Sequence, residues 1–240
     1  AHLADCRGHD IITSDGSTLL GADDKAGIAE IITALQWFLE HPEVSHGKIR
    51  LAFTCDEEVG RGTDKFDVQA FAADYAYTVD REAAGEIEDE TFCADRATVT
   101  FVGKNVHPGY AKGKLVNSMK AAGRLLDTLD KNKAPETTDG RLGYLHPIAV
   151  SGDVEKSTIN LIVRDFEETG LKELEKILSS RVEDAAAAYP GMRHEIEIKE
   201  QYRNMKYRLA REPRITELAI EAVTRAGGKP HRAAIRGGTD

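Results

Sequence analysis

Three short apolar runs in the first eighty residues each end on acidic side chains. The first run leads through Gly-Ala into Asp23, the second ends at Glu57 and Glu58, and the third ends at Asp80. In open α/β sheets, ligands bind in the crevice beyond the carboxyl ends of the strands. The pattern therefore predicts an α/β domain whose carboxylates gather at one rim of a sheet.

A single amphipathic helix is predicted between the first two runs. Apolar residues recur at helical spacing over 25–40, and Pro42 ends the pattern. Asp24 is the expected cap of this helix, because a carboxylate at a helix N-terminus accepts backbone N–H groups that have no other partner. Alternating apolar residues predict strands at 48–54 and 74–80.

From about residue 92 the pattern changes to strands and helices in the order β-α-β-β-α-β. The two central strands are joined by a turn at Gly152-Asp153. This order matches the ferredoxin-like unit, in which two helices cover one face of a four-stranded antiparallel sheet. The expected elements are strands at 96–103, 145–152, 157–166 and 193–202, and helices at 116–129 and 171–189.

Two domains are therefore expected. Residues 92–205 form a ferredoxin-like α+β domain, which interrupts an α/β domain made of residues 1–91 and 206–240. The second part of the α/β domain begins with a helix from Pro213 and ends in the segment "AAIRGGTD".

Composition argues against several function classes. The net charge is −9 and no basic run offers a footprint for phosphates, so a nucleic-acid partner is not expected. No apolar run approaches the roughly 18 residues of a membrane helix, and the start of the chain lacks the pattern of a signal peptide. Three widely spaced cysteines indicate neither a disulfide framework nor a Cys-x-x-Cys metal site. A cytoplasmic protein with no membrane partner is expected.

The converging carboxylates favour a bound cation. Acidic groups that meet without basic partners repel one another, and a divalent metal relieves this repulsion. Asp23 is therefore a candidate ligand, although a single aspartate at a strand end is more often a cap or a turn residue. Glu57 and Glu58 point in different directions at the end of a strand, so one can bind the metal while the other acts as a general base. The alternative for this pair is a solvated loop.

Three basic residues stand out in the rest of the sequence. His107 lies in a His-Pro-Gly segment after a strand, where the alternative is an ordinary surface turn. Arg164 lies on a strand among apolar residues, where an arginine pairs with a neighbour such as Asp165 or binds a substrate carboxylate. Arg236 begins the glycine loop, residues 236–239, whose backbone N–H groups also suit a carboxylate.

Six segments in series closely resemble the M20 family of di-zinc peptidases, and within it the aminotripeptidases. They are "LLGADDKAGIAEIITAL", "AFTCDEEVGRGTDKFDV", "YAYTVD", "GKNVHPGYAKGK", "IVRDF" and "IRGGTD". The resemblance runs from residue 7 to residue 240. It implies a zinc-peptidase-like α/β domain interrupted by a ferredoxin-like lid, two zinc ions, and release of the N-terminal residue from tripeptides.

The resemblance also implies a role for each acidic candidate. Asp23 matches the carboxylate that bridges both zinc ions, while Glu58 and Asp80 each match a ligand of one zinc. Glu57 matches the general base, which takes a proton from the water shared by the metals and returns it to the leaving amine.

The basic candidates match residues around the substrate. His107 and Arg164 match lid residues that hold the substrate or its tetrahedral intermediate. Arg236 matches a glycine-loop arginine near the substrate. A lid that clamps the substrate's C-terminal carboxylate would limit the length of the peptide.

The family's metal site also uses two histidines that this sequence lacks. One belongs to a His-x-Asp motif well before residues 21–24, and the other follows the glycine loop. None of the eight histidines stands in either context. Carboxylates alone suit harder cations than Zn²⁺ and would weaken its binding. We therefore expect an internal portion of a longer peptidase, and an inactive chain is compatible with this assignment.

Two other hypotheses stay open. Other M20-type dipeptidases and amidohydrolases share the metal motifs, although "NVHPGYAKGK" favours the tripeptidase. Alternatively, the chain is a non-catalytic fragment that forms a homodimer through an exposed edge of the ferredoxin-like sheet. A metal-free dimer would favour the second hypothesis, whereas metal-dependent turnover that is lost in Glu57→Ala would favour the enzyme.

Overall fold

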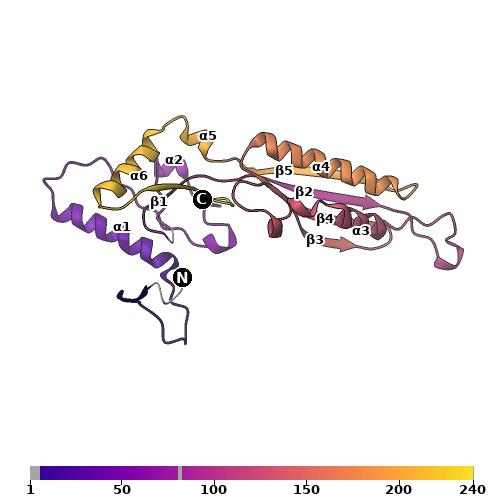
Figure 1. The fold of residues 1–240 in the computed structure, drawn as a ribbon, viewed down its shortest axis with the longest axis horizontal. Coiled ribbons are helices and arrows are strands. Elements are labelled where there is room, and N and C mark those ends of the chain that lie inside the picture. Colours follow the sequence, from indigo (N-terminus) through magenta and orange to yellow (C-terminus); the bar gives the residue numbers. More distant parts are fainter. Residues whose placement is uncertain (1–5, 81–82, 240) are drawn as a thin grey trace. The chain divides into compact units, whose positions relative to one another are not determined.

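The computed structural model describes residues 6–80 and 83–239 (Figure 1). The chain divides into two compact units, one that extends up to Ala84 and one that comprises Gly85–Thr239. The domain boundaries expected near residues 92 and 205 would divide the second unit further and stay a prediction. Among the described residues, no helix is long and apolar enough to cross a membrane.

The first unit contains the amphipathic helix that the sequence predicts. Helix α1 comprises Ala22–Glu40, and the residue before it, Gly21, has a left-handed backbone with φ 68°. Asp23 and Asp24 have non-helical dihedral angles, so the regular helix follows them. The carboxylate Oδ1 of Asp24 accepts a hydrogen bond from the backbone N–H of Gly27 at 3.1 Å. The capping role expected for Asp24 is confirmed.

The prediction of two strands in the first unit is wrong. Residues 48–54 and 74–80 are in no strand, and the other elements described in this unit are the 3₁₀ turn Glu57–Val59 and helix α2 (Val68–Phe71). The reason is physical: a strand needs a neighbour that completes its ladder of hydrogen bonds. No described strand pairs with either segment, although both have the alternating sequence of a strand.

The second unit contains a four-stranded antiparallel sheet with the strand order β3-β4-β2-β5 (Figure 1). The sequence predicts these elements in the observed order, with boundaries that differ by up to three residues. They are β2 (Cys93–Val102), α3 (Ser118–Thr128), β3 (Tyr144–Gly152), β4 (Lys156–Asp165), α4 (Glu168–Ala187) and β5 (Arg193–Tyr202). Short 3₁₀ turns lie at Pro108–Tyr110, Lys131–Lys133 and Pro135–Thr137.

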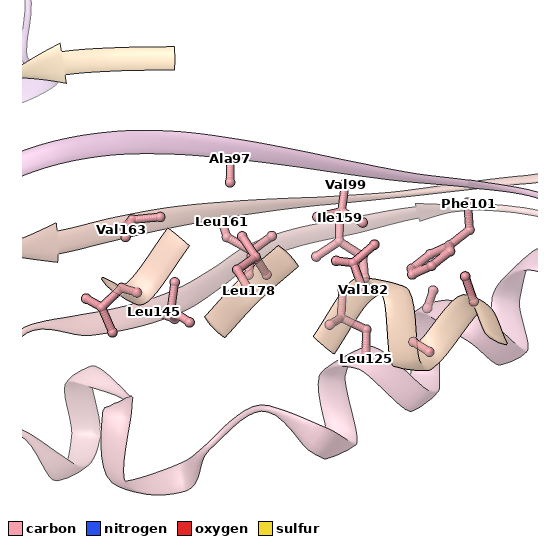
Figure 2. Close-up of a cluster of buried hydrophobic side chains, with 14 of the residues drawn as sticks. Ala97, Val99, Phe101, Leu125, Leu145, Ile159, Leu161, Val163, Leu178 and Val182 are labelled. Carbon is pink, nitrogen blue, oxygen red and sulfur yellow. The ribbon is translucent and has the colours of Figure 1, made fainter. Parts of the chain in front are cut away.

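The main hydrophobic core lies between one face of this sheet and its two helices (Figure 2). Ala97 of β2 pairs with Leu161 of β4, so the two side chains lie on the same face of the sheet. Every second residue along each strand points to that face. Leu125 of α3 and Leu178 of α4 belong to the same buried cluster. Both helices therefore cover one face of the sheet.

A second, smaller sheet joins two distant parts of the chain. Strand β1 (Glu86–Glu90) pairs in parallel with β6 (His231–Ala234). Strand β1 is not predicted from the sequence, because its residues "EIEDE" are mostly acidic and have no clear alternation of apolar residues. Helices α5 (Lys206–Leu209) and α6 (Arg214–Arg225) precede β6.

A buried asparagine links the two segments that connect the small sheet to the large sheet. The side-chain oxygen of Asn204, which is 1% exposed, accepts hydrogen bonds from the backbone N–H groups of Thr91 and Lys206, both at 3.0 Å. Its amide nitrogen donates to the carbonyl of Phe166 at 3.0 Å and to Glu90 Oε2 at 3.4 Å. Because each of these groups is paired, Asn204 links the segment that follows β1 to the segment that follows β5.

Two acidic side chains share a buried site beneath α4. Asp95 of β2 is 1% exposed and lies 2.7 Å from the guanidinium Nη1 of Arg203. Burial raises the pKa of Glu175, and its hydrogen bond to Asp95 raises it further. Burial also acts to raise the pKa of Asp95, but the hydrogen bonds from Glu175 and Arg203 outweigh it, so this pKa is lowered. The opposite directions of the two shifts favour Glu175 as the carrier of a proton shared by this pair, while the ammonium of Lys172, 2.9 Å from Glu175 Oε2, favours the ionised form of Glu175.

Replacing Asn204 with alanine is expected to destabilise the second unit. The buried N–H groups of Thr91 and Lys206 would lose their acceptor, which should lower the free energy of unfolding by about 2–4 kcal/mol. Urea denaturation measures this change. Asn105→Ala is the control, because Asn105 is exposed. An equal effect of the two substitutions would contradict the role assigned to Asn204.

Glu175→Gln is expected to change how stability depends on pH. The raised pKa of Glu175 means that its stabilising contribution is complete below its unfolded value and is lost as the pH rises through its folded pKa. Glutamine keeps an N–H donor for Asp95 but cannot ionise. Urea denaturation at about pH 4 and about pH 8 should show the wild type losing stability relative to the variant at the higher pH. Glu183→Gln, exposed on the same helix, should show no such difference.

Candidate metal centre and substrate site

A glycine brings the first turn of α1 against the segment that ends at Asp80. Gly27 is the buried residue of α1, and a Cβ atom added to it would lie 2.1 Å from the carbonyl oxygen of Val79. The same atom would lie 2.6 Å from Asp24 Oδ1. The close approach therefore depends on glycine, and it makes the segments that carry Asp23 and Asp80 neighbours.

The acidic pair Glu57 and Glu58 lies in a tight turn. Asp56 before the turn and Gly60 after it both have left-handed backbones, with φ values of 66° and 69°. The N–H of Gly60 donates to the carbonyl of Glu57 at 2.7 Å, and the N–H of Arg61 donates to that of Asp56 at 3.0 Å. These bonds hold two adjacent, exposed carboxylates on a short backbone turn.

The described residues do not assemble a complete set of metal ligands. No group of three or more His, Cys, Asp or Glu side chains in this part of the chain is close enough to hold a metal ion. The structure thus brings the segments of Asp23 and Asp80 together, but it does not gather Asp23, Glu58 and Asp80 around one point. The donors themselves, all carboxylate oxygens, fit the chemistry of a divalent cation.

His107 is exposed and begins the 3₁₀ turn at Pro108–Tyr110. Its ring nitrogen Nδ1 accepts a hydrogen bond from the backbone N–H of Gly109 at 3.2 Å. In the neutral imidazole the proton therefore lies on Nε2. This leaves His107 with an N–H donor on the far side of its ring, which suits a substrate oxygen.

Arg164 is buried on β4, and protein groups contact its guanidinium. Nη1 donates to the carbonyls of Asp95 at 3.1 Å and of Val163 at 3.0 Å, and Nη2 donates to Gln201 Oε1 at 2.9 Å. The guanidinium carbon lies 5.6 Å from the centre of the Tyr202 ring. The partners of Arg164 are thus main-chain and amide oxygens, and its predicted contact with substrate stays a prediction.

Arg236 likewise contacts the protein's own main chain. Its guanidinium donates to carbonyl oxygens of the segment 138–142, which leads into β3. The predicted contact between Arg236 and substrate stays a prediction.

Two residues that support these candidates, Gly27 and Tyr202, are not predicted from the sequence. Gly27 interrupts an otherwise regular helical pattern, and an isolated glycine in such a pattern is a signal of close approach by another segment. Tyr202, which contacts both Arg164 and the glycine loop, ends an exposed strand and carries no comparable signal.

Comparison with known proteins identifies close relatives. The chain is 49% identical over 242 residues to Peptidase T of Geobacillus thermodenitrificans, and 45% identical over 238 residues to Peptidase T of Bacillus subtilis. Each match covers 99% of this chain but 58% of the relative. The chain thus spans less than two thirds of the length of these relatives.

Solved structures share the fold. The aminopeptidase PepT from Bacillus cereus has a TM-score of 0.75 and 24% sequence identity, and the match covers 95% of this chain and 61% of that one. A tripeptidase from Staphylococcus aureus also has a TM-score of 0.75, with 23% identity over 94% of this chain and 60% of that one. The mixed α/β fold that the sequence predicts is confirmed.

A family profile matches most of the sequence. The profile described as Peptidase family M20/M25/M40 covers residues 16–240, which include all seven candidate site residues. This protein therefore belongs to peptidase family M20/M25/M40.

Proposed function

We propose that this chain carries the catalytic carboxylates of a metal-dependent aminopeptidase that releases the N-terminal residue from tripeptides. The observation that carries the proposal is the glycine contact that makes the segments of Asp23 and Asp80 neighbours. It occurs in a chain that is 49% identical to a protein named Peptidase T. The proposal concerns the longer protein as well, since this chain covers 58% of that relative.

The proposed metal ligands are Asp23, Glu58 and Asp80. Asp23 would bridge two zinc ions, and Glu58 and Asp80 would each bind one of them. A bound metal pair would polarise the scissile carbonyl and make water more acidic. The three carboxylates supply the negative charge that a pair of divalent cations requires.

Glu57 is the proposed general base. Its carboxylate would accept the proton of the attacking water and return it to the leaving amine, which carries the new N-terminus of the dipeptide product. Its place next to Glu58 on a tight turn supports this role, because the turn holds a base beside a ligand. The exposure of Glu57 leaves it accessible to water.

His107 and Arg164 are the proposed substrate residues of a ferredoxin-like lid at 92–205. The Nε2–H of His107 would donate to the oxygen that becomes negative in the tetrahedral intermediate. Arg164 would attract the C-terminal carboxylate of the peptide and so limit its length.

We also propose that the lid forms a homodimer through β3, an edge strand on which Ile148 and Val150 are exposed.

Metal-dependent hydrolysis of a simple tripeptide tests the proposed reaction. With added Zn²⁺, Co²⁺ or Mn²⁺, a longer protein that adds the two metal-binding histidines to this chain should cleave the peptide, and Glu57→Ala should lower its kcat by about 10²–10⁴-fold because the general base is lost. Glu43→Gln, which changes an exposed residue after α1, is the control. Hydrolysis that continues in a chelator, or that Glu57→Ala leaves unchanged, would contradict the proposal.

Gly27→Ala tests the proposed metal site without requiring turnover. The new methyl group would push the carbonyl of Val79 away from α1 and so separate the segments of Asp23 and Asp80. Calorimetric titration should show Zn²⁺ affinity that is lower by about 10–100-fold. Gly47→Ala is the matched control, because a Cβ atom at Gly47 meets nothing within 4 Å. Equal affinities in the two variants would argue against a shared site.

A further inference from the structure

Arg236 uses both terminal nitrogens of its side chain to hold one segment of backbone. Nη1 donates to the carbonyl oxygens of Gly140 at 2.7 Å and Leu142 at 2.9 Å. Nη2 donates to the carbonyl of Thr138 at 3.3 Å and to its hydroxyl at 3.0 Å. Each terminal nitrogen has two N–H groups, so these four acceptors match all four donors.

The guanidinium also lies against aromatic rings. Its central carbon is 5.2 Å from the ring centre of Phe92 and 5.7 Å from that of Tyr144. Phe92 is fully buried, and its ring meets that of Tyr144 edge to face. These contacts fix the plane of the guanidinium and so the direction of its hydrogen bonds.

The loop that follows Arg236 is held from two other sides. The carbonyl of Gly237 accepts a hydrogen bond from the backbone N–H of Phe92 at 3.1 Å. A Cβ atom on Gly238 would lie 2.8 Å from Cζ of Tyr202, so the backbone there rests directly on the tyrosine ring. Gly238 and Thr239 themselves are exposed. We call residues 236–239 the glycine loop.

We propose that Arg236 is a positioning residue that fixes the glycine loop to the segment 138–142, and that this pair of segments forms a pre-organised binding surface for the peptide substrate. The inference rests on the proposed function in one respect, namely that the ligand of this surface is a peptide. It differs from the role expected from sequence, because Arg236 acts through the main chain instead of contacting the substrate.

The chemistry of the side chain explains why arginine is needed. A guanidinium presents parallel N–H groups in a rigid plane, which can reach three carbonyls at once. A lysine carries the same charge but offers one nitrogen, and it cannot span Thr138, Gly140 and Leu142 together. Charge alone therefore cannot replace Arg236.

Hydrogen exchange tests the clamp in the whole chain without any need for activity. Backbone amides in 138–142 and in the glycine loop should exchange about tenfold faster or more in Arg236→Lys and in Arg236→Ala. Arg225→Lys is the matched control, because Arg225 is an exposed arginine at the end of α6. Guanidinium ion, far below denaturing concentrations, should restore the slow exchange in Arg236→Ala, whereas ammonium ion should not.

Binding of a tripeptide to the same variants tests the link to substrate. In the presence of Zn²⁺, NMR titration should give a Kd that is about tenfold higher for both Arg236 variants, and guanidinium ion should restore binding to Arg236→Ala.

A wild-type rate of amide exchange in Arg236→Lys would overturn the clamp between Arg236 and residues 138–142, since a positive charge would then suffice. Faster exchange with unchanged tripeptide binding would overturn the positioning role. A wild-type chain that binds no tripeptide would count against the proposed function, while the exchange result still decides whether the clamp exists.

Discussion

The second unit depends on the need to satisfy polar groups at the place where its two sheets meet. Asn204 is buried there, and its amide bonds to the backbone after β1, to the end of β4 and to the start of α5. Its amide nitrogen also contacts the carboxylate of Glu90, whose backbone carbonyl accepts the N–H of Ile235. Since the glycine loop begins at the next residue, its place follows from that of the buried amide.

The two arginines expected to bind substrate illustrate how the same chemistry serves two purposes. A guanidinium that suits a carboxylate also suits several backbone carbonyls, because both offer oxygen acceptors to its N–H groups. In this structure Arg164 and Arg236 bond to carbonyl oxygens of their own chain. An arginine among apolar residues therefore indicates oxygen acceptors nearby, and only the fold reveals whether a ligand or the main chain supplies them.

Periodicity predicted the elements that have a local signature. The four-stranded sheet and its helices follow from strong alternation of apolar residues and from the Gly152-Asp153 turn, and helix α1 follows from its single apolar face. The segments 48–54 and 74–80 have strand sequences but pair with no strand in the described part of the chain, which no local pattern can reveal. Strand β1 is the opposite case, because an acidic sequence becomes a strand through its pairing with β6. For the site, motif order placed Asp23, Glu57 and Asp80 in the chain, whereas the contact at Gly27 required coordinates.

The contacts of Arg236 have a consequence for how the sequence around it can change. Three of its four acceptors are main-chain carbonyls, which every amino acid provides. Substitutions at positions 139 and 141 can therefore preserve the acceptors, whereas Gly140 has a left-handed backbone with φ 49° that favours glycine. An insertion or deletion in this segment would instead shift the carbonyls out of register with the guanidinium. Apart from Gly140, the segment is thus tolerant of side-chain variation but strict about its length.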